Sequence, residues 1–440
     1  MRRVAVIGSG IAGLAAARGL HGLAQVTLFE AGNYFGGHTH TVDVTLDGIT
    51  HGVDTGFLVL NERTYPKLLK MFAELDVPIA KSEMSFSVQV PAIGLEWSGN
   101  NLDTVFAQRR NVWRPAFWRM LFDLLRFNRL ATALARDGLD AELDEPIDAF
   151  LVRHHFGAEF RDWYFLPMIG CIWSCPVDQM LRFPVGTMIR FCHNHGLLQI
   201  ADRPQWYTVP GGARRYVERL LEAIPDARLN TSVRSVRRLT DGHADTGVLV
   251  STDAGTERFD EVVMACHSDQ SLALLADPTP AERRVLGAIR YQRNRAVLHT
   301  DVSVLPTRRR AWAAWNYERS ARVGDEQPSV CLHYLINRLQ PLPFATSVIV
   351  SLNPVAEPRD GTVLGEFDYA HPVFDTAAVA AQSQLGALQG AKRTWFCGAW
   401  TRYGFHEDGL ASGLAVVDGL RTHLAQAAPA PAPAPEQAVA

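Results

Sequence analysis

Near its N-terminus the chain reads Val4-Ala5-Val6-Ile7-Gly8-Ser9-Gly10-Ile11-Ala12-Gly13. Val4–Ile7 is a short apolar run typical of a buried parallel strand, and the Ala- and Leu-rich segment from Ile11 to about Leu20 predicts a helix. The glycines between them have separate tasks: Gly8 permits a tight turn, Gly10 lets the backbone approach a pyrophosphate, and Gly13 lets the helix pack close to the strand. This arrangement predicts a β–α–β unit that binds a dinucleotide.

A carboxylate strengthens that prediction. A second strand is expected at Val26–Glu30, and Glu30 ends it about twenty residues after the glycines, where a carboxylate can hold both ribose hydroxyls. Glu30 also argues against a 2′-phosphate on that ribose. The N–H groups at the start of the helix would face the phosphates. The alternative is a glycine-rich turn in some other α/β protein.

Two other regions favour FAD over NAD. The diglycine Gly36-Gly37 lies just after the second strand, and the turn Asp54-Thr55-Gly56-Phe57 can bring backbone toward a cofactor. Far along the chain, the strand-like Phe396–Trp400 is followed by Asp408–Gly413 at the start of a helix. A second helix N-terminus of this kind can stabilise negative charge on a reduced flavin. The alternative is a helix capped by Asp408, with close packing at the two glycines that follow it.

These motifs predict both the architecture and the cofactor site. We expect an α/β flavoprotein of the two-dinucleotide-binding-domain type, with a discontinuous FAD domain and a substrate domain made of a mixed sheet plus helices. The expected boundaries are 1–60, 205–275 and 390–424 for the FAD domain, 61–204 and 276–389 for the substrate domain, and 425–440 for a disordered Ala/Pro tail. The residues expected to bind FAD are Gly8, Ser9, Gly10, Ile11, Ala12, Gly13, Glu30, Ala31, Gly36, Gly37, His38, Thr39, Asp54, Thr55, Gly56, Phe57, Val233, Gly398, Ala399, Asp408, Gly409, Leu410 and Ser412.

Apolar periodicity gives coarse elements for the rest of the chain. Strands of the substrate domain are predicted at Val297–Val304, Val330–Ile336 and Val348–Leu352. Residues 103–200 are predicted to be mostly helical, and the last helix is expected from Leu410 to Leu424.

Composition narrows the classes of function. The formal net charge over 440 residues is −3, so nucleic acid is not an expected partner. Cys192, His193 and His195 could form half a metal site, but ordinary buried thiols are the better interpretation of the six cysteines, and no metal cofactor is expected. The sequence contains no signal peptide and no apolar run long enough to cross a membrane, so we expect a cytoplasmic protein.

The glycine motifs at both ends make the chain similar to the flavin-containing amine oxidase superfamily, which includes carotenoid desaturases and protoporphyrinogen oxidase. It resembles more closely a branch of bacterial flavoproteins known only as NAD/FAD-binding, together with the flavin domain joined to plant cyclopropane fatty acid synthases. The resemblance runs from Met1 to about Leu424. The closer match is carried by Asn61–Pro66, Met84–Val88, Trp206–Gly212 and Tyr403–Leu410.

The resemblance implies an FAD-dependent oxidoreductase in which a hydride passes from a substrate carbon to flavin N5. It also implies a lipid context. The substrate would be an unsaturated or methyl-branched acyl chain of a lipid, or another hydrophobic small molecule. A fatty acyl methyltransferase would be a partner, and the protein would contact the inner face of the membrane peripherally. Two alternatives are a flavin amine oxidase that uses oxygen and an accessory subunit that holds FAD for such a methyltransferase.

Departures from the amine-oxidase pattern count against amines as substrates. The arginine that usually follows the diglycine is His38 here, and Ala399 and Trp400 stand where that pattern has an acidic residue. Amine oxidases also use a lysine bound through water to flavin N5. No lysine occurs between Lys81 and Lys392, so oxygen activation in that manner is not expected.

Two residues near the last helix are candidates for removing a proton from the substrate. His406 lies just before the predicted helix N-terminus, and the ordinary pKa of histidine suits a base near neutral pH. Glu407 is the alternative. His406 could equally be a loop histidine that packs or caps.

Asn111–Leu130 predicts an amphipathic helix of a different character. Such a helix can lie in the interface of an anionic membrane. The alternative is a core-facing helix whose arginines are solvated. Its apolar residues at helical spacing are Trp113, Phe117, Met120, Leu121, Leu124 and Leu125, with Arg114, Arg119, Arg126 and Arg129 between them.

Overall fold

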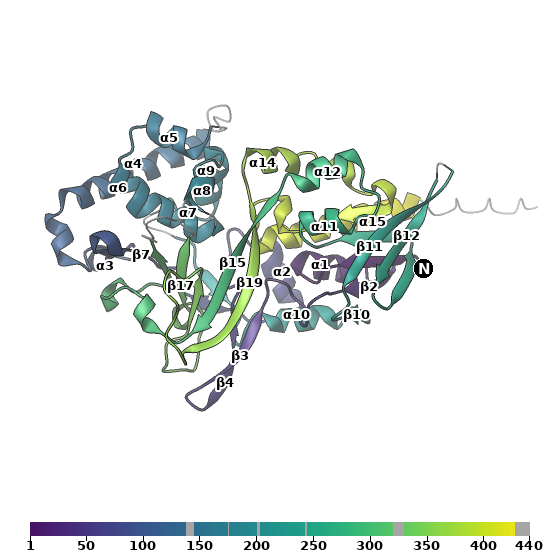
Figure 1. Cartoon of the computed structure of the whole chain (residues 1–440), viewed down its shortest axis with the longest axis horizontal. Helices are drawn as coiled ribbons and strands as arrows, with labels where there is room; N and C mark the ends of the chain where they lie inside the picture. The colour runs from purple at the N-terminus through teal and green to yellow at the C-terminus, as the bar shows by residue number, and fades with distance from the viewer. Residues whose placement is uncertain (138–144, 175, 200–202, 243, 320–329, 427–440) are drawn as a thin grey trace, which may run out of the picture.

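The computed structural model describes residues 1–137, 145–174, 176–199, 203–242, 244–319 and 330–426. Its first sheet has five parallel strands in the order β10-β2-β1-β14-β20. The sheet draws on three separate parts of the chain, from the N-terminus, the middle and the C-terminus (Figure 1). The strands are β1 (Arg3–Ile7), β2 (Gln25–Phe29), β10 (Asp226–Arg228), β14 (Glu261–Met264) and β20 (Thr394–Phe396).

Both faces of this sheet are buried, which explains why its strands are continuously apolar. Val4 and Val6 of β1 pack with one core, which contains residues of the helices α1, α10 and α15. Ala5 and Ile7 point the other way, into a core shared with a three-stranded sheet. Because side chains alternate along a strand, each face needs its own apolar set. These covering elements are α1 (Ile11–Gly19), α10 (Arg214–Leu221), α15 (His406–Gln426), β11 (Val233–Asp241), β12 (Ala244–Thr252) and β13 (Gly255–Phe259).

A second, mixed sheet has seven strands in the order β19-β15-β18-β17-β16-β7-β8. Its pairs are antiparallel except for β16 with β7. Three strands correspond to predicted runs, although Val302–Val304 forms a short 3₁₀ helix beyond the end of β15. The strands are β7 (Phe86–Val90), β8 (Leu95–Ser98), β15 (Arg290–His299), β16 (Trp315–Glu318), β17 (Cys331–Leu335), β18 (Ile349–Leu352) and β19 (Val363–Val373).

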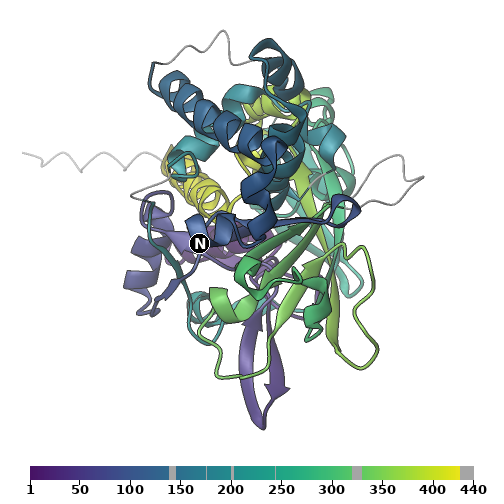
Figure 2. The same cartoon turned by 90° about the vertical axis from the view of Figure 1, so that its left-hand side faces the viewer.

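A helical lobe lies against this second sheet, and its long helix α4 runs along the outside (Figures 1 and 2). Most of the segment 103–200 is helical where it is described, as predicted. None of the described helices is both long enough and apolar enough to span a membrane. The helices of the lobe are α3 (Leu102–Val105), α4 (Pro115–Asp137), α5 (Ile147–Arg153), α6 (Ala158–Phe160), α7 (Leu166–Trp173), α8 (Val177–Met180) and α9 (Val185–Asn194), with a 3₁₀ helix at Arg109–Trp113 and a π-helical turn at Arg161–Phe165.

The remaining elements join the two sheets. The hairpin of β3 and β4 projects away from the body of the molecule in both views (Figures 1 and 2). They are β3 (Thr41–Leu46), β4 (Ile49–Asp54), β5 (Leu60–Asn61), α2 (Pro66–Glu74), β6 (Ala80–Ser82), β9 (Trp206–Thr208), α11 (Ser268–Leu274), α12 (Pro280–Gly287), α13 (Ile336–Leu339) and α14 (Thr376–Gln382).

The predicted class, an α/β fold with a mixed sheet and helices in the second part, is confirmed. The predicted last helix was too short, because α15 begins at His406 and ends at Gln426, two residues inside the predicted tail. The rest of that tail, 427–440, lies outside the described residues. The exact domain boundaries stay a prediction.

Candidate cofactor and active site

One large cavity, of about 1350 Å³, connects the parallel sheet with the helical lobe. Ligand pockets usually measure roughly 300–1000 Å³, so this cavity has room for a dinucleotide and a second molecule. Its cofactor end is formed mainly by backbone and small residues, whereas its far end is formed by large apolar side chains. The predicted FAD-binding residues that line it are Gly8, Ser9, Gly10, Ile11, Ala12, Glu30, Ala31, Gly36, Gly37, His38, Thr55, Gly56, Phe57, Val233, Gly398 and Ala399.

The three glycines of the first loop have three different surroundings. Gly8 has φ +102°, a conformation that side-chain-bearing residues rarely adopt. A Cβ on Gly13 would lie 1.9 Å from the carbonyl oxygen of Gly8, so only glycine allows α1 to approach the loop. A Cβ on Gly10 would meet no atom of the chain within 4 Å, because Gly10 faces the cavity. That open position is what close approach of a ligand to the backbone requires.

Glu30 braces the same loop. One carboxylate oxygen accepts hydrogen bonds from the Ser9 backbone N–H at 3.0 Å and from the Ser9 hydroxyl at 2.5 Å, and the other accepts the Gly32 N–H at 2.8 Å. No side chain caps the N-terminus of α1 at Gly10. The loop therefore presents a helix N-terminus and a carboxylate to the cavity, which suit a phosphate and a ribose respectively.

The diglycine brings His38 to the same end of the cavity. Its buried Nε2 atom has no hydrogen-bond partner. The centroid of its ring lies 5.2 Å from that of Tyr369 and 5.2 Å from that of His371, both on β19. Burial, reinforced by His267, lowers the pKa of His38 to about 4, so the ring is neutral at physiological pH. An orphaned, buried, neutral nitrogen in the cavity wall fits a ligand that supplies its missing hydrogen-bond partner.

The start of α15 agrees with the second interpretation offered by the sequence, a capped helix with closely packed glycines. Asp408 accepts the Phe405 N–H at 3.1 Å and so caps the helix, and it is absent from the described cavity lining. Gly409 packs against Ile11, and a Cβ on Gly413 would lie 2.3 Å from the Ala12 carbonyl oxygen. Close packing of α1 and α15, rather than contact with a ligand, thus accounts for these glycines.

Other residues predicted to bind FAD lie behind the cavity wall. The Ser412 hydroxyl accepts the Gly398 N–H at 2.9 Å, and Leu410 is buried in the core. Asp54 accepts hydrogen bonds from the Ala213 N–H at 3.0 Å and from Gln340 Nε2 at 2.6 Å. Burial raises the pKa of Asp54 to about 7 despite these donors. These side chains hold the loops that line the cavity.

His406 lines the cavity, but its geometry differs from that of a free base. Its Nε2 atom lies 3.0 Å from the Thr39 hydroxyl and 2.5 Å from the Tyr216 hydroxyl, and its ring stacks on Phe57 at 3.8 Å. Burial, followed by the influence of His38, lowers the pKa of His406 to about 3. The ring is therefore neutral and connects three structural elements.

Glu407 has a role that the sequence did not indicate. Its carboxylate oxygens accept the backbone N–H groups of Lys67 at 2.9 Å and Leu68 at 3.0 Å, in the first turn of α2. Glu407 does not belong to the described lining of the cavity. The prediction of Glu407 as an alternative base conflicts with this geometry, in which it caps a neighbouring helix.

Residues 11–326, more than half of the chain, match the family described as flavin containing amine oxidoreductase. The chain belongs to this family. It is therefore an FAD-dependent oxidoreductase, and the residues at the cofactor end of the cavity are those that would hold FAD.

Solved structures share the fold of this flavoprotein along nearly its whole length. One is a CLA-producing fatty acid isomerase from P. acnes, with a TM-score of 0.66 and 15% identity, covering 96% of this chain and 98% of that one. Another is putrescine oxidase bound to putrescine, with a TM-score of 0.66, 16% identity, and 96% and 99% coverage. A third is cyclohexylamine oxidase from Brevibacterium oxydans IH-35A, with a TM-score of 0.64, 16% identity, and 96% and 99% coverage.

Several cavity residues of the flavoprotein lie outside every sequence motif. His267 and His371 reach the cofactor end from the loop after β14 and from β19. At the far end, Asn128 Oδ1, Trp173 Nε1 and Trp315 Nε1 are buried without hydrogen-bond partners. Only tertiary pairing brings these side chains together, so no local pattern could have indicated them.

The cysteines and histidines considered as half a metal site do not form one within the described chain. Cys192 donates to the Met188 sulfur at 3.7 Å, and the ring of His195 stacks on Phe191 at 3.8 Å. Both contacts are packing within or beside α9. Cys192 and His195 are both buried.

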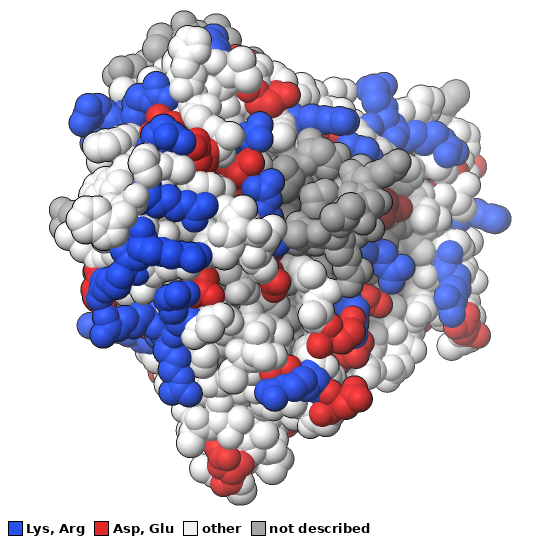
Figure 3. Space-filling model, turned by 60° about the vertical axis from the view of Figure 1, so that its left-hand side comes forward, with Lys and Arg blue, Asp and Glu red and all other residues white. Residues whose placement is uncertain are grey.

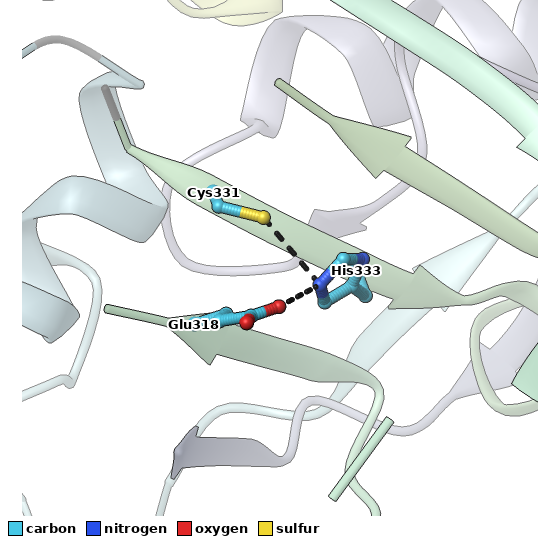
Figure 4. A group of neighbouring side chains, drawn as sticks. All are labelled: Glu318, Cys331 and His333. Atoms are coloured by element: carbon cyan, nitrogen blue, oxygen red, sulfur yellow. Dashed lines mark hydrogen bonds and ion pairs between the residues drawn. The ribbon is translucent and has the colours of Figure 1, made fainter. Parts of the chain in front are cut away.

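A different group of side chains lies on the second sheet (Figure 4). His333 Nε2 is 3.0 Å from a Glu318 carboxylate oxygen and 3.4 Å from the Cys331 sulfur. Its Nδ1 atom is 2.6 Å from the Ser351 hydroxyl, which also contacts His299 Nε2 at 2.7 Å. Burial lowers the pKa of His333, but Cys331 and Glu318 outweigh it and raise the value to about 9. These five side chains are hydrogen-bonded to one another, and none of them belongs to the described lining of the cavity.

Proposed function

We propose that the protein oxidises or desaturates an unsaturated or methyl-branched acyl chain of a lipid, with FAD as the hydride acceptor. The observation that supports this proposal is the far end of the cavity, whose wall is built from large apolar side chains. A long hydrocarbon is stabilised there at roughly 25 cal/mol per Å² of apolar surface removed from water. The apolar residues of this wall include Phe86, Trp97, Phe106, Trp118, Leu121, Leu124, Tyr164, Met168, Ile172 and Phe191.

The charges of the lining argue against amines. Within the described lining, Glu30 is the one carboxylate, and it is held by Ser9 and Gly32 at the cofactor end. An ammonium group would enter the apolar end without an acidic partner, and burial of an unpaired charge is costly. The proteins that act on putrescine or cyclohexylamine are similar to this chain in fold alone.

Bound FAD supplies an acceptor for the hydride that leaves the substrate carbon. The chain positions the substrate against the cofactor and excludes water from the reacting carbon. His406 links Thr39 of the cofactor loop to Tyr216 of α10, so it fixes the wall where the two ends of the cavity meet. The aromatic side chains of the far end exclude water from the reacting carbon. We therefore assign His406 a positioning role, and a neutral ring of low pKa is consistent with it.

Anaerobic titration tests the proposal. The FAD-loaded protein is mixed with a phospholipid carrying unsaturated acyl chains, with the saturated counterpart, or with a diamine, and the flavin absorbance is followed. Bleaching by the unsaturated lipid alone supports the proposal. Bleaching by the diamine would favour an amine oxidase. No bleaching by any of them would favour an accessory subunit that holds FAD without turning over.

A further inference from the structure

Exposed apolar side chains gather at one place on the helical lobe. We call this group the α3–α4 patch. Trp113 is 86% exposed, Leu102 78% and Phe122 65%. Water-facing residues of this size and density are unusual on a monomer unless they contact a partner or a membrane. The members of the patch are Leu102, Val112, Trp113, Trp118, Phe122 and Leu125.

The core of the protein does not need this patch. On α4, Phe117, Met120 and Phe127 are fully buried and form the core-facing stripe. Trp118, Phe122 and Leu125 recur at the same helical spacing on an exposed face. The helix therefore has two apolar stripes, of which one packs inside and the other faces outward.

Four residues of the patch also contribute to the wall of the cavity. Leu102, Trp118, Phe122 and Leu125 belong to the wall of the same cavity as Gly10. Because these wall residues are also exposed, the cavity reaches the surface at the patch. A hydrophobic molecule that enters there passes along the apolar wall toward the cofactor end.

Positive charge borders the patch. Residues 101–136 contain seven arginines and two aspartates, although the whole chain has a formal charge of −3. Arg119 pairs with Glu159 and Arg126 with Asp123, whereas Arg110 and Arg129 are exposed at the two ends of the stripe. Figure 3, which brings this side of the molecule forward, shows basic side chains gathered with uncharged surface between them.

We propose that the α3–α4 patch docks on the surface of an anionic phospholipid membrane, with the mouth of the cavity turned toward the acyl chains. Its rings would enter the boundary between headgroups and acyl chains, and its arginines would meet the anionic headgroups. The source of the substrate, an acyl chain drawn from that bilayer, rests on the proposed function. The docking itself does not, because it can be measured without turnover.

Vesicle flotation of the full-length, FAD-loaded protein tests the docking. Vesicles of phosphatidylcholine with phosphatidylglycerol are compared with vesicles of phosphatidylcholine alone. Trp113→Gln removes the most exposed ring without touching the described cavity wall, and Arg110→Glu with Arg129→Glu reverses the charge at both ends of the stripe. Matched controls are Val152→Gln, at a residue 75% exposed on α5 of the same lobe, and Arg219→Glu on α10.

The parent and both controls should float with vesicles that contain phosphatidylglycerol. They should not float with vesicles of phosphatidylcholine alone. The ring variant and the double charge reversal should each lose binding by about tenfold or more, with FAD content unchanged. A parent that does not float, or patch variants that float as well as the parent, would overturn the proposal. Either failure is separable from failure of the proposed function, since bleaching of the flavin by detergent-solubilised lipid would still show turnover.

Discussion

The two ends of the cavity are lined by different parts of the chain, one mainly by backbone and the other mainly by side chains. At the cofactor end the wall is backbone, with Gly8, Gly10 and Gly37 where a side chain would stand and with Glu30 bracing the loop. At the far end the wall is large side chains from α4, α7 and the second sheet. The shape of the cofactor end depends on the absence of side chains. The shape of the far end depends on the size of the side chains that surround it. Mutations at the cofactor end should therefore exclude the cofactor altogether. Mutations at the far end should change the fit of the substrate by degrees.

The largest effect is expected at Gly10. Gly10→Val places its side chain in open space, so the protein should fold but lose FAD binding by more than about a hundredfold. Gly13→Val provides the contrast, because its Cβ would overlap the Gly8 carbonyl and prevent folding. Flavin absorbance after gel filtration and circular dichroism separate the two. A folded Gly10→Val protein that still binds FAD fully would show that the cofactor does not approach the backbone at Gly10.

The next effect is expected at His406, where the two ends meet. His406→Ala should slow flavin reduction by roughly tenfold, because Thr39 and Tyr216 lose their common partner. His406→Gln, which keeps a hydrogen-bonding group there, should recover most of the rate. Single-turnover reduction across a range of pH checks this. Equal losses of about a hundredfold in both variants, with a flattened pH profile, would show that His406 takes the proton.

Acid should weaken the cofactor end first. Burial, followed by neighbouring histidines, lowers the pKa of His38 and His267 to about 4 and of His371 and His406 to about 3, from an ordinary value of 6.5. Below pH 6.5 the unfolded chain binds more protons than the native one, so the free energy of unfolding falls as pH falls from 6.5 toward 4.

Thermal melts of the protein across this window test the effect. The melting temperature should drop with falling pH, and His371→Phe should reduce the drop by removing one of the titrating rings. The raised pKa of Asp54 acts in the opposite direction and limits the net slope. A melting temperature that is constant across the window would contradict the assignment of neutral, buried histidines.

At the far end a smaller effect is expected, on stability rather than on turnover. Asn128 Oδ1 is buried without a partner, so Asn128→Leu should raise the free energy of unfolding by about 1 kcal/mol. The same change should leave kcat/KM within about twofold, because the hydrocarbon proposed for this end carries no hydrogen-bond donor for the Asn128 oxygen. Chemical denaturation and steady-state kinetics give the two numbers. Loss of stability would indicate that packing, rather than an unmet hydrogen bond, governs this site.

The smallest effect is expected at Glu407. Glu407→Gln weakens the cap on α2 and should lower the free energy of unfolding by about 1 kcal/mol. FAD content and the rate of flavin reduction should stay the same. A large loss of rate with unchanged stability would restore Glu407 as a candidate base. It would also contradict the distinction between residues that line the cavity and residues that hold the lining in place.

The cofactor end was predictable because its constraints are local. A strand, a tight turn and a helix start within ten residues leave few arrangements, and Gly8, Gly13 and Glu30 then have determined positions. The same motifs did not distinguish residues that line the cavity from those that hold it. Asp54, Asp408 and Glu407 are polar residues beside glycine-rich turns, and only their tertiary hydrogen-bond partners reveal that they support the wall.

The parts of the cavity wall that long-range pairing builds, at both ends, were less predictable. β19 is exposed or half-buried over most of its length, includes Pro372, and lacks the apolar run that indicates a strand, yet it pairs along the whole length of β15. His371 reaches the cavity through that pairing. The sequence of α4 indicated an amphipathic helix, but a helix with both a buried and an exposed apolar stripe cannot be told from one with a single broad face until its neighbours are known.

The contact between α1 and α15 has a consequence for how the protein is made. A ribosome releases β1 and α1 first, while Gly413, on which the Ala12 carbonyl packs, emerges some 400 residues later. The N-terminal half of the cofactor site must therefore wait, with an apolar helix face uncovered, until α15 has been synthesised. Only a chain that already includes α15 can close the site around its flavin. Capture of the cofactor thus marks the end of folding rather than its beginning, and a prematurely terminated product would be left colourless and open to proteases.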